Sequence, residues 1–363
     1  KKTFKNCVLL VFDERSMIAA ELLGMIEKYA RKVVHNGLHE DDFFGGIPVI
    51  LMVGDDYQLP PVGIGAAGNF SDDQPRGSAF KMGIVRNGLQ AFKTLGQNYI
   101  KLQTSKRVLQ GQNLLTRCLM GVRGDTNRGL SKNDINKLMQ FHLNSTHWTR
   151  KQVDQIENDS KTIHLFASKD ERDKHNSRKL VQVNTKDTPI AVIKAVAENS
   201  CKTKSKDHYD NDRWPSRTCI CVGCKVSLVG INIKPEWGLY HGSMGTVLDI
   251  VYKNKTGPHT EGTARDKLPE YVLVDFPQYC GPNMYEHDES LGMEDRKKRR
   301  TWVPMPMMMG RCKHNGACAR LYMPLVVSFG KTIHSFQGAS VGKTPPGRPD
   351  NAYERIVGDP GQR

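Results

Sequence analysis

The N-terminal part of the chain alternates apolar runs with an amphipathic segment. Residues 7–12 and 47–53 are continuous apolar runs, which are typical of strands buried on both faces of a parallel sheet. The apolar residues between them recur at helical spacing and are Ile18, Leu22, Met25, Ile26 and Tyr29. The pattern predicts an α/β architecture, with ligand-binding loops at the carboxyl ends of the strands.

The pattern changes twice further along the chain. A strand over residues 162–167 and a helix over 170–180 are followed, from 181 to 320, by short alternating runs between turns rich in Gly, Pro and Asn. These runs predict a small β-rich insertion. Another long apolar run, residues 321–329, predicts a strand that returns to the α/β core.

Composition narrows the class of protein. The 363 residues suit two or three domains, and 38% hydrophobic with 25% charged residues is an ordinary globular balance. Lys and Arg number 53 against 38 Asp and Glu, a net charge of +15. This excess favours a polyanionic partner such as nucleic acid, although many soluble proteins are equally basic. No apolar run has the length of a membrane span, so we expect no membrane partner.

Nine cysteines, an odd number in a long chain, argue against a disulfide scaffold and for a reducing compartment. Cys221 and Cys224 have the spacing of half a structural zinc site, but such a site usually takes four ligands in paired spacings. Reduced cysteines in strands and loops are the interpretation that we favour.

Two adjacent carboxylates, Asp13 and Glu14, follow the first apolar run. Hydrolysis of ATP needs such a pair: one carboxylate holds Mg²⁺, usually through its water shell, and the other orients or deprotonates the attacking water. We assign Asp13 to the metal and Glu14 to the water. By itself the pair also fits the solvated start of a loop.

A second motif, residues 54–62, follows the second apolar run. Gly54 permits a sharp turn. Gln58 offers a neutral donor and acceptor for the γ-phosphate or the attacking water, and Pro60 and Pro61 stiffen the exit from the loop. Two strand-end motifs in this order make a ligand-free, proline-rich turn the weaker interpretation.

These two motifs resemble motifs two and three of superfamily-one helicases, in particular the PIF (petite integration frequency) type and its RecD-like and Helitron-encoded relatives. Further segments match in chain order. Residues 102–107 are similar to motif four, 166–169 with Asn176 to the segment after it, 239–247 to the hairpin of the family's β-barrel insertion, and 332–338 to motif five. Two positions differ: the family often has Lys where Ser335 stands, and Asn where His241 stands.

The resemblance implies RecA-like parallel-sheet motor lobes with an inserted small β-barrel-like domain. The first lobe would comprise residues 1–105. The second would comprise residues 106–180 and 321–363, on either side of an insertion at 181–320.

The resemblance also implies an ATP-dependent DNA helicase that moves five-prime to three-prime along single-stranded DNA. Its cofactors would be ATP and Mg²⁺, its partners single-stranded and duplex DNA, and its state monomeric. The residues that the resemblance assigns are Glu14, Gln58 and Arg107 for catalysis, Asp13, Ser16, Gly54, Asp55 and Gln337 for the nucleotide and its metal, and Thr332, His334, His241, Pro60 and Pro61 for DNA.

In the family, a Gly-Lys-Ser/Thr phosphate loop precedes the Asp-Glu strand, and an arginine motif follows motif five. This chain carries neither, so we expect it to hydrolyse ATP negligibly by itself. The rival hypotheses are a non-catalytic nucleic-acid-binding remnant of a helicase or mobile element, and a nucleotide hydrolase that acts on no nucleic acid. The resemblance further implies the nucleus, or the mitochondrion, and roles in DNA repair, recombination and telomere maintenance.

Other features of the sequence have two interpretations each. The basic run at residues 296–300 fits a nuclear-targeting or nucleic-acid patch, but such runs are more often solvated loops. Trp214 and Trp237 could stack on bases, although burial in the β-rich insertion is the commoner fate.

Overall fold

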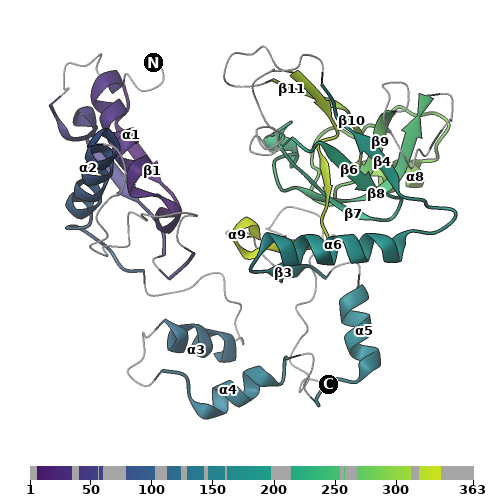
Figure 1. Cartoon of the computed structure of the whole chain (residues 1–363), viewed down its shortest axis with the longest axis horizontal. Coiled ribbons are helices and arrows are strands. Elements are labelled where there is room, and N and C mark those ends of the chain that lie inside the picture. Colours follow the sequence, from purple (N-terminus) through teal and green to yellow (C-terminus); the bar gives the residue numbers. More distant parts are fainter. Residues whose placement is uncertain are drawn as a thin grey trace. The chain divides into compact units, whose positions relative to one another are not determined.

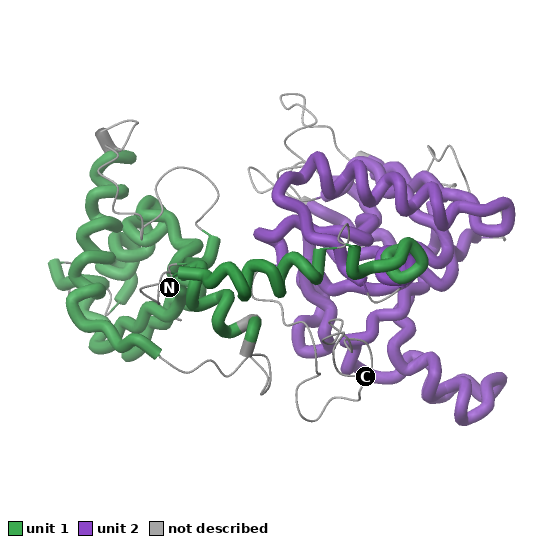
Figure 2. Tube along the Cα trace, turned by 90° about the horizontal axis from the view of Figure 1, so that it is seen from below, with its two compact units in different colours: residues 1–153 green, residues 154–363 purple. Residues whose placement is uncertain are grey.

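The structure is a computed structural model, and it describes residues 6–34, 41–55, 57–59, 79–102, 113–123, 129–142, 146–159, 162–197, 214–253, 257, 268–311 and 319–336. The chain divides into two compact units, residues 1–153 and 154–363, coloured separately in Figure 2. None of the helices in the described part of the chain has the length and apolarity that a membrane span requires.

Unit 1 is built on two strands and several helices (Figure 1). Its elements are β1 (Leu9–Phe12), η2 (Arg15–Met17), α1 (Ala20–Val33), η4 (Phe43–Gly46), β2 (Val49–Met52), α2 (Ala79–Leu95), α3 (Asn113–Val122) and α4 (Lys132–Met139). α5 (Arg150–Asn158) lies across the division between the units. β1 and β2 pair in parallel, as the β–α–β pattern predicts.

Among the described residues, helices cover the β1–β2 sheet on one face only. Its inner face, with Leu10 and Ile50, packs into the core formed with α1 and α2. On the other face Leu9, Val11 and Leu51 are 50, 49 and 48% exposed. The prediction of strands buried on both faces is therefore wrong for this chain, because the described helices cover a single side of the sheet.

The backbones of α1 and α2 touch where the two helices cross. A Cβ atom on Gly24 would lie 2.0 Å from the carbonyl oxygen of Ile84, and one on Gly88 would lie 1.8 Å from the carbonyl oxygen of Ala20. No side chain fits at such distances, so glycine at both positions is a condition of this packing.

The helix predicted for α1 is present, but only Ile18 and Ile26 of the predicted apolar residues pack against the core. Leu22, Met25 and Tyr29 are 49, 37 and 61% exposed. The buried residues of the helix are Ala20, Leu23, Gly24, Glu27 and Ala30. Close contact with α2 selects small residues rather than the most hydrophobic ones, and hydrophobic spacing alone does not reveal this.

Glu27 is 1% exposed and ties α1 to two other segments. Its carboxylate accepts hydrogen bonds from Asn87 Nδ2 at 2.5 Å, from Arg31 Nε at 2.5 Å and from the backbone N–H of Phe44 at 3.3 Å. A buried carboxylate is costly unless its oxygens have donors, and these three groups supply them.

Unit 2 contains an antiparallel sheet with helix α6 packed beside it (Figure 1). Its elements are β3 (His164–Phe166), α6 (Lys169–Val183), β4 (Ala191–Lys194), β5 (Val196–Ala197), β6 (Arg217–Ile220), β7 (Lys225–Leu228), η5 (Pro235–Trp237), β8 (Met244–Tyr252), β9 (Pro269–Asp275), α8 (Met293–Lys298), η8 (Arg299–Thr301), β10 (Trp302–Pro306), β11 (Met308–Arg311), β12 (Ala319–Tyr322), β13 (Leu325–Val327), β14 (Gly330–Thr332) and α9 (Ile333–Phe336).

The main sheet of unit 2 has the strand order β10-β9-β8-β7-β13. Its inward residues, such as Val226, Val247 and Val274, are fully buried in one core to which α6 contributes Leu180. Smaller antiparallel sheets are β11-β12-β5 and β4-β6, whereas β14 and β3 pair in parallel.

Residues 321–329 do not form the single strand that the sequence predicts. β12 ends at Tyr322, and β13 starts at Leu325 and pairs antiparallel with β7 in the main sheet. Pro324 stands between the two strands, and proline has no N–H to give to a ladder. The chain joins the parallel pair only at β14.

Cys221 and Cys224 are both 0% exposed and belong to the core of unit 2. Their thiols hydrogen-bond to each other, and this bond lowers the pKa of Cys221 and raises the pKa of Cys224. Within the described residues, no group of three or more potential metal ligands is present. Their burial in this core supports the interpretation that we favour, reduced cysteines.

The basic run at residues 296–300 is used largely for local structure. Arg296 donates from Nε to the carbonyl oxygen of Leu291 at 2.9 Å. The guanidinium group of Arg299 lies 4.9 Å from the ring centre of Trp302 and 5.5 Å from that of Tyr285. These contacts support the structural interpretation of the run.

Candidate functional site

Asp13 and Glu14 lie where β1 ends and η2 begins. The backbone N–H of Glu14 donates to Asp13 Oδ1 at 2.9 Å. Glu14 has φ 54° and ψ 50°, a left-handed conformation that is uncommon for residues other than glycine. It costs on the order of 1–3 kcal/mol and is seen most often at functional sites. The turn places both carboxylates at the carboxyl end of the strand.

Two oxygen atoms in this turn, Glu14 Oε2 and Ser16 Oγ, are buried and have no hydrogen-bond partner among the described groups. An orphaned buried oxygen is costly, so the turn is suited to a ligand that supplies the missing partner. Mg²⁺ prefers hard oxygen ligands and commonly takes one or two carboxylates. The oxygens of Asp13 and Ser16 are a donor set that fits this ion, and the carboxylate of Glu14 in the same turn is left for the attacking water.

Gly54, after β2, touches the same turn. The backbone N–H of Arg15 donates to the carbonyl oxygen of Val53 at 3.0 Å. A Cβ atom on Gly54 would lie only 2.6 Å from the Arg15 nitrogen, so a residue with a side chain does not fit here. The structure thus brings the loop after β1 and the loop after β2 into direct contact.

Asp55 holds the second loop in shape. Its Oδ1 accepts from the backbone N–H of Tyr57 at 3.2 Å, and its carbonyl oxygen accepts from that of Gln58 at 3.0 Å. A guanidinium nitrogen of Arg123 lies 2.5 Å from Asp55 Oδ1, and the guanidinium group lies 5.2 Å from the Tyr57 ring centre. The sequence gives no signal for Arg123, because nothing near it in the chain indicates contact with this loop.

Gln58 lies in the same loop after β2 and is half-buried. Four other expected site residues, Pro60, Pro61, Arg107 and Gln337, lie outside the described residues. Their assignments stay predictions.

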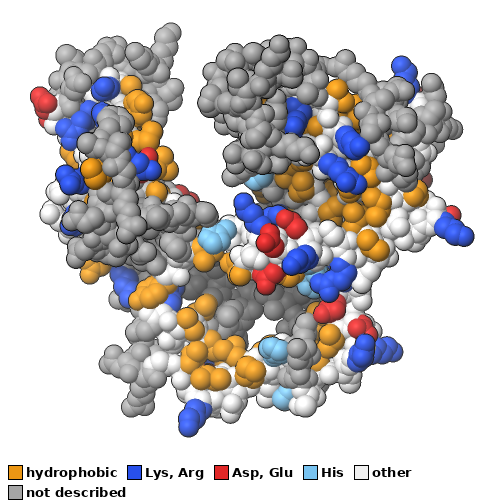
Figure 3. All heavy atoms as spheres, in the orientation of Figure 1, with side chains coloured by type: hydrophobic (Ala, Val, Ile, Leu, Met, Phe, Trp, Pro, Cys, Tyr) orange, Lys and Arg blue, Asp and Glu red, His pale blue; other side chains and the backbone are white. Residues whose placement is uncertain are grey.

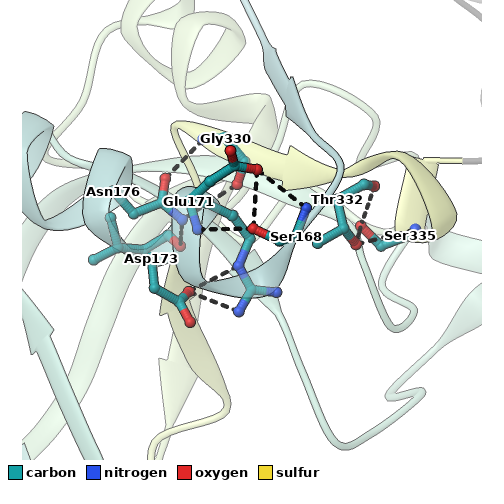
Figure 4. A network of polar contacts seen from close by, with 9 residues as sticks. Ser168, Glu171, Asp173, Asn176, Gly330, Thr332 and Ser335 are labelled. Carbon is teal, nitrogen blue, oxygen red and sulfur yellow. Dashed lines mark hydrogen bonds and ion pairs between the residues drawn. The ribbon is translucent and has the colours of Figure 1, made fainter.

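In unit 2, Thr332 and Ser335 shape the junction between β14 and α9 (Figure 4). Thr332 Oγ1 lies 3.0 Å from Ser335 Oγ and accepts from the Ser335 backbone N–H at 3.4 Å, while Ser335 Oγ donates to the Thr332 carbonyl oxygen at 2.8 Å. Thr332 is buried and His334 is half-exposed. Ser335, which differs from the family pattern, therefore has a structural use in this chain.

Asn176 of α6 fixes the bend before β14 (Figure 4). Its Nδ2 donates to the carbonyl oxygens of Val327 and Gly330 at 3.1 and 3.2 Å, and its Oδ1 accepts from the Gly330 N–H at 2.7 Å. At the start of the same helix, Ser168 and Glu171 form a capping box. The segment that leads into Thr332 is thus held by side-chain bonds from a rigid helix.

The exposed side of α6 carries both signs of charge. Figure 3 shows acidic and basic side chains interspersed over this helix. Its first turn contains Asp170 and Glu171, and basic residues follow. The helix is therefore not a basic stripe for nucleic acid.

His241 lies in a tight turn that is tied to β14. Its backbone N–H donates to Asn232 Oδ1 at 2.7 Å. Lys331 Nζ donates to the carbonyl oxygen of the next residue, Gly242, at 2.8 Å. Burial lowers the pKa of Lys331 to about 8. The structure therefore brings two of the expected DNA-contacting segments, 239–247 and 332–338, together where they are described.

His164 and His175 pack beside the parallel strand pair, with ring centres 4.3 Å apart. Burial lowers the pKa of His175 to about 4 and also lowers the pKa of His164. Burial thus disfavours the charged form of both rings, so they contribute packing rather than positive charge to this region.

Comparison with known proteins agrees with this geometry. Residues 1–70, which include both strand-end loops of unit 1, match the family model for PIF1-like helicases. The crystal structure of Pif1 helicase from Candida albicans superposes with a TM-score of 0.62 and 19% identity, covering 94% of this chain and 67% of that one. The chain has the Pif1 helicase fold.

A second similar structure is Bacteroides Pif1 bound to single-stranded DNA, with a TM-score of 0.53 and 16% identity, covering 94% of this chain and 65% of that one. The chain thus spans about two thirds of the length of these Pif1 structures. No curated protein sequence matches it. The resemblance to PIF-type helicases that the motifs indicate is confirmed, and so is the α/β class of the fold.

Proposed function

We propose that this chain is part of an ATP-dependent DNA helicase motor. The observation that carries the proposal is the contact between Gly54 and Arg15, which joins the loop after β2 to the Asp13–Glu14 turn. Loops at the carboxyl ends of parallel strands are where α/β proteins bind nucleotides. The PIF1-like match over residues 1–70 covers both loops and supports the proposal.

In this proposal Asp13 holds Mg²⁺ with Ser16 nearby, and Glu14 orients the attacking water or takes its proton. When bound, Mg²⁺ neutralises negative charge on the phosphates. Gln58 contacts the γ-phosphate or the water, and Asp55 keeps the loop in the shape that presents Gln58. The buried, unpartnered oxygens of Glu14 and Ser16 support these roles.

The remaining site residues extend the proposal to the phosphates and to DNA. They are Gly54, Arg107 and Gln337 for the nucleotide, and Thr332, His334, His241, Pro60 and Pro61 for DNA. A Bacteroides Pif1 of similar fold has been solved with ADP-AlF3 and single-stranded DNA, which supports both ligand classes.

The proposed architecture is two RecA-like lobes, residues 1–105 and residues 106–180 with 321–363, with a β-barrel-like insertion at 181–320. Hydrolysis would open the lobes and step them five-prime to three-prime along single-stranded DNA. We also propose a monomeric motor that acts on single-stranded and duplex DNA in the nucleus or the mitochondrion, with roles in repair, recombination and telomere maintenance.

The test uses a longer gene product that includes a phosphate loop upstream of this chain. Its ATP turnover should rise when single-stranded DNA is added. Glu14→Gln should lower turnover by at least about a hundredfold and leave ATP binding intact, because the variant loses the general base but keeps the metal ligand. Glu21→Gln, which changes an exposed ion pair with Lys81, is the matched control and should keep wild-type turnover.

Other outcomes would point to the rival hypotheses. A protein that binds single-stranded DNA but never hydrolyses ATP is a non-catalytic remnant. A protein whose turnover ignores DNA is a different nucleotide hydrolase. Loss of ATP binding in Glu14→Gln would contradict the assignment of Glu14 to the water.

A further inference from the structure

Tyr240 is 46% exposed in unit 2, whereas most other large aromatic residues described there are packed. Trp214 is 7% exposed and stacks on Tyr322 with ring centres 6.1 Å apart. Trp237 packs edge-on against Tyr279 at 6.4 Å. The two tryptophans that the sequence offers for base stacking are therefore used inside the fold, and Tyr240 is the described tyrosine of this unit that is left exposed.

We propose that Tyr240 is a base-stacking residue that holds a nucleobase of single-stranded DNA against unit 2. This inference rests on the proposed function of the same surface as a DNA interface. An aromatic face stacks on any base, so the contact would bring affinity without sequence preference.

The backbone that carries Tyr240 is fixed before any ligand binds. The Tyr240 N–H donates to Ser243 Oγ at 3.0 Å, and the Ser243 N–H donates to the Tyr240 carbonyl oxygen at 2.9 Å. Ser243 Oγ donates in turn to the carbonyl oxygen of Gly238 at 2.7 Å. Little ordering of the chain is then needed on binding, and pre-organisation of this kind strengthens a contact.

The turn also lies next to positive charge. Lys234 pairs through its backbone with Leu239, the residue before Tyr240. The Lys234 side chain is 50% exposed; its ammonium group lies 3.7 Å from Glu236 Oε1, in an exposed ion pair, and 5.3 Å from the Trp237 ring centre. On the other side, Lys331 Nζ bonds to Gly242 and thereby joins the turn to the β14–α9 junction. Single-strand binders combine exposed aromatic rings with basic side chains, and here the basic side chain in solvent near the turn is that of Lys234, whereas Lys331 is buried.

The experiment compares binding of the 363-residue chain to two labelled oligonucleotides of equal length by fluorescence anisotropy. One carries ordinary bases, and the other carries abasic sugars on the same phosphate backbone. Tyr240→Ala should weaken binding to the first by about tenfold and leave binding to the second unchanged, because only the base contact is lost. Tyr240→Phe keeps the ring and should bind like the wild type.

Tyr29→Ala is the control, because Tyr29 is 61% exposed in unit 1 and has no place in the proposed interface. Thermal melting of each variant checks that it folds. Equal weakening of both oligonucleotides, or no weakening in Tyr240→Ala, would overturn the stacking role while leaving the DNA interface in place. Failure of the wild-type chain to bind either oligonucleotide would overturn the DNA interface and the stacking role together.

Discussion

Lys331 and Gly242 are joined by a 2.8 Å hydrogen bond from the lysine ammonium to the glycine carbonyl oxygen. Lys331 belongs to β14 of the parallel pair, and Gly242 belongs to the turn beside the antiparallel sheet. The bond therefore links the two segments of unit 2 that we assign to DNA. Burial of the Lys331 ammonium group lowers its pKa to about 8.

The stability of the chain should depend on pH through Lys331. Its pKa falls from 10.5 in the unfolded chain to about 8 in the folded one. Between these two pKa values the unfolded state binds more protons, so the contribution of Lys331 to the free energy of unfolding rises with pH there. Below about pH 8 this contribution is constant. When the pH is raised from about 7 to about 9.5, the free energy of unfolding of the wild type should increase by on the order of 1–2 kcal/mol relative to that of Lys331→Met.

Urea unfolding of both proteins across this range measures the difference. Lys194→Met, which removes an exposed lysine of the same unit, is the control. Parallel pH dependences for the wild type and Lys331→Met would show that burial of the ammonium group does not influence stability.

The glycine crossing of α1 and α2 should tolerate no side chain. In Gly88→Ala the new methyl group meets the Ala20 carbonyl, so the free energy of unfolding of unit 1 should fall by about 1–3 kcal/mol. Gly83→Ala on the same helix meets nothing within 4 Å and should raise it by up to about 1 kcal/mol through helix propensity. Thermal or urea unfolding measures both free energies of unfolding. Equal changes in Gly88→Ala and Gly83→Ala would contradict the close crossing of the two helices.

Asn176 should be needed for the bend before β14. Asn176→Ala leaves the N–H of Gly330 and two carbonyl oxygens without their hydrogen-bond partner. The free energy of unfolding should therefore fall by about 2–4 kcal/mol. Amide hydrogen exchange gives a local measure, because the Gly330 N–H should lose protection. Gln182→Ala, at an exposed position of the same helix, is the control. Unchanged protection of Gly330 in Asn176→Ala would rule out the proposed clamp.

The exposed face of the β1–β2 sheet should bind hydrophobic dyes. Val11 and Leu51 lie opposite each other in the register and are 49 and 48% exposed. The double variant Val11→Thr, Leu51→Thr should lower the fluorescence of bound anilinonaphthalene sulfonate without lowering the melting temperature, since threonine also favours strands. Leu10→Thr with Ile50→Thr changes the inner face instead and should lower the melting temperature. The opposite pattern would mean that the inner and outer faces are assigned wrongly.

The local content of the fold could be predicted from the sequence. Runs of apolar residues indicated β1 and β2 and their parallel pairing, and the helix expected over residues 170–180 lies within α6. The Asp13–Glu14 pair and the loop from Gly54 to Gln58 could be found because strand-end motifs are continuous in the chain. Their order along the chain is what made the resemblance to PIF-type helicases specific.

Contacts between distant segments were decided by the tertiary structure. The buried face of α1 depends on Gly24 meeting Gly88, and the anchor of the second loop is Arg123, which no local pattern connects to Asp55. Likewise, the pairing of β13 with β7 depends on where the chain bends after Tyr322.

Local elements could be predicted and distant contacts could not, because the interactions that determine them act over different ranges along the chain. Backbone propensity and hydrophobic period act over a few residues, so the sequence by itself determined the elements and the order of the motifs. Close packing and buried hydrogen bonds act between whatever surfaces meet in space. Only the tertiary structure could therefore place Gly54 against Arg15, bind Lys331 to Gly242 and leave Tyr240 in solvent.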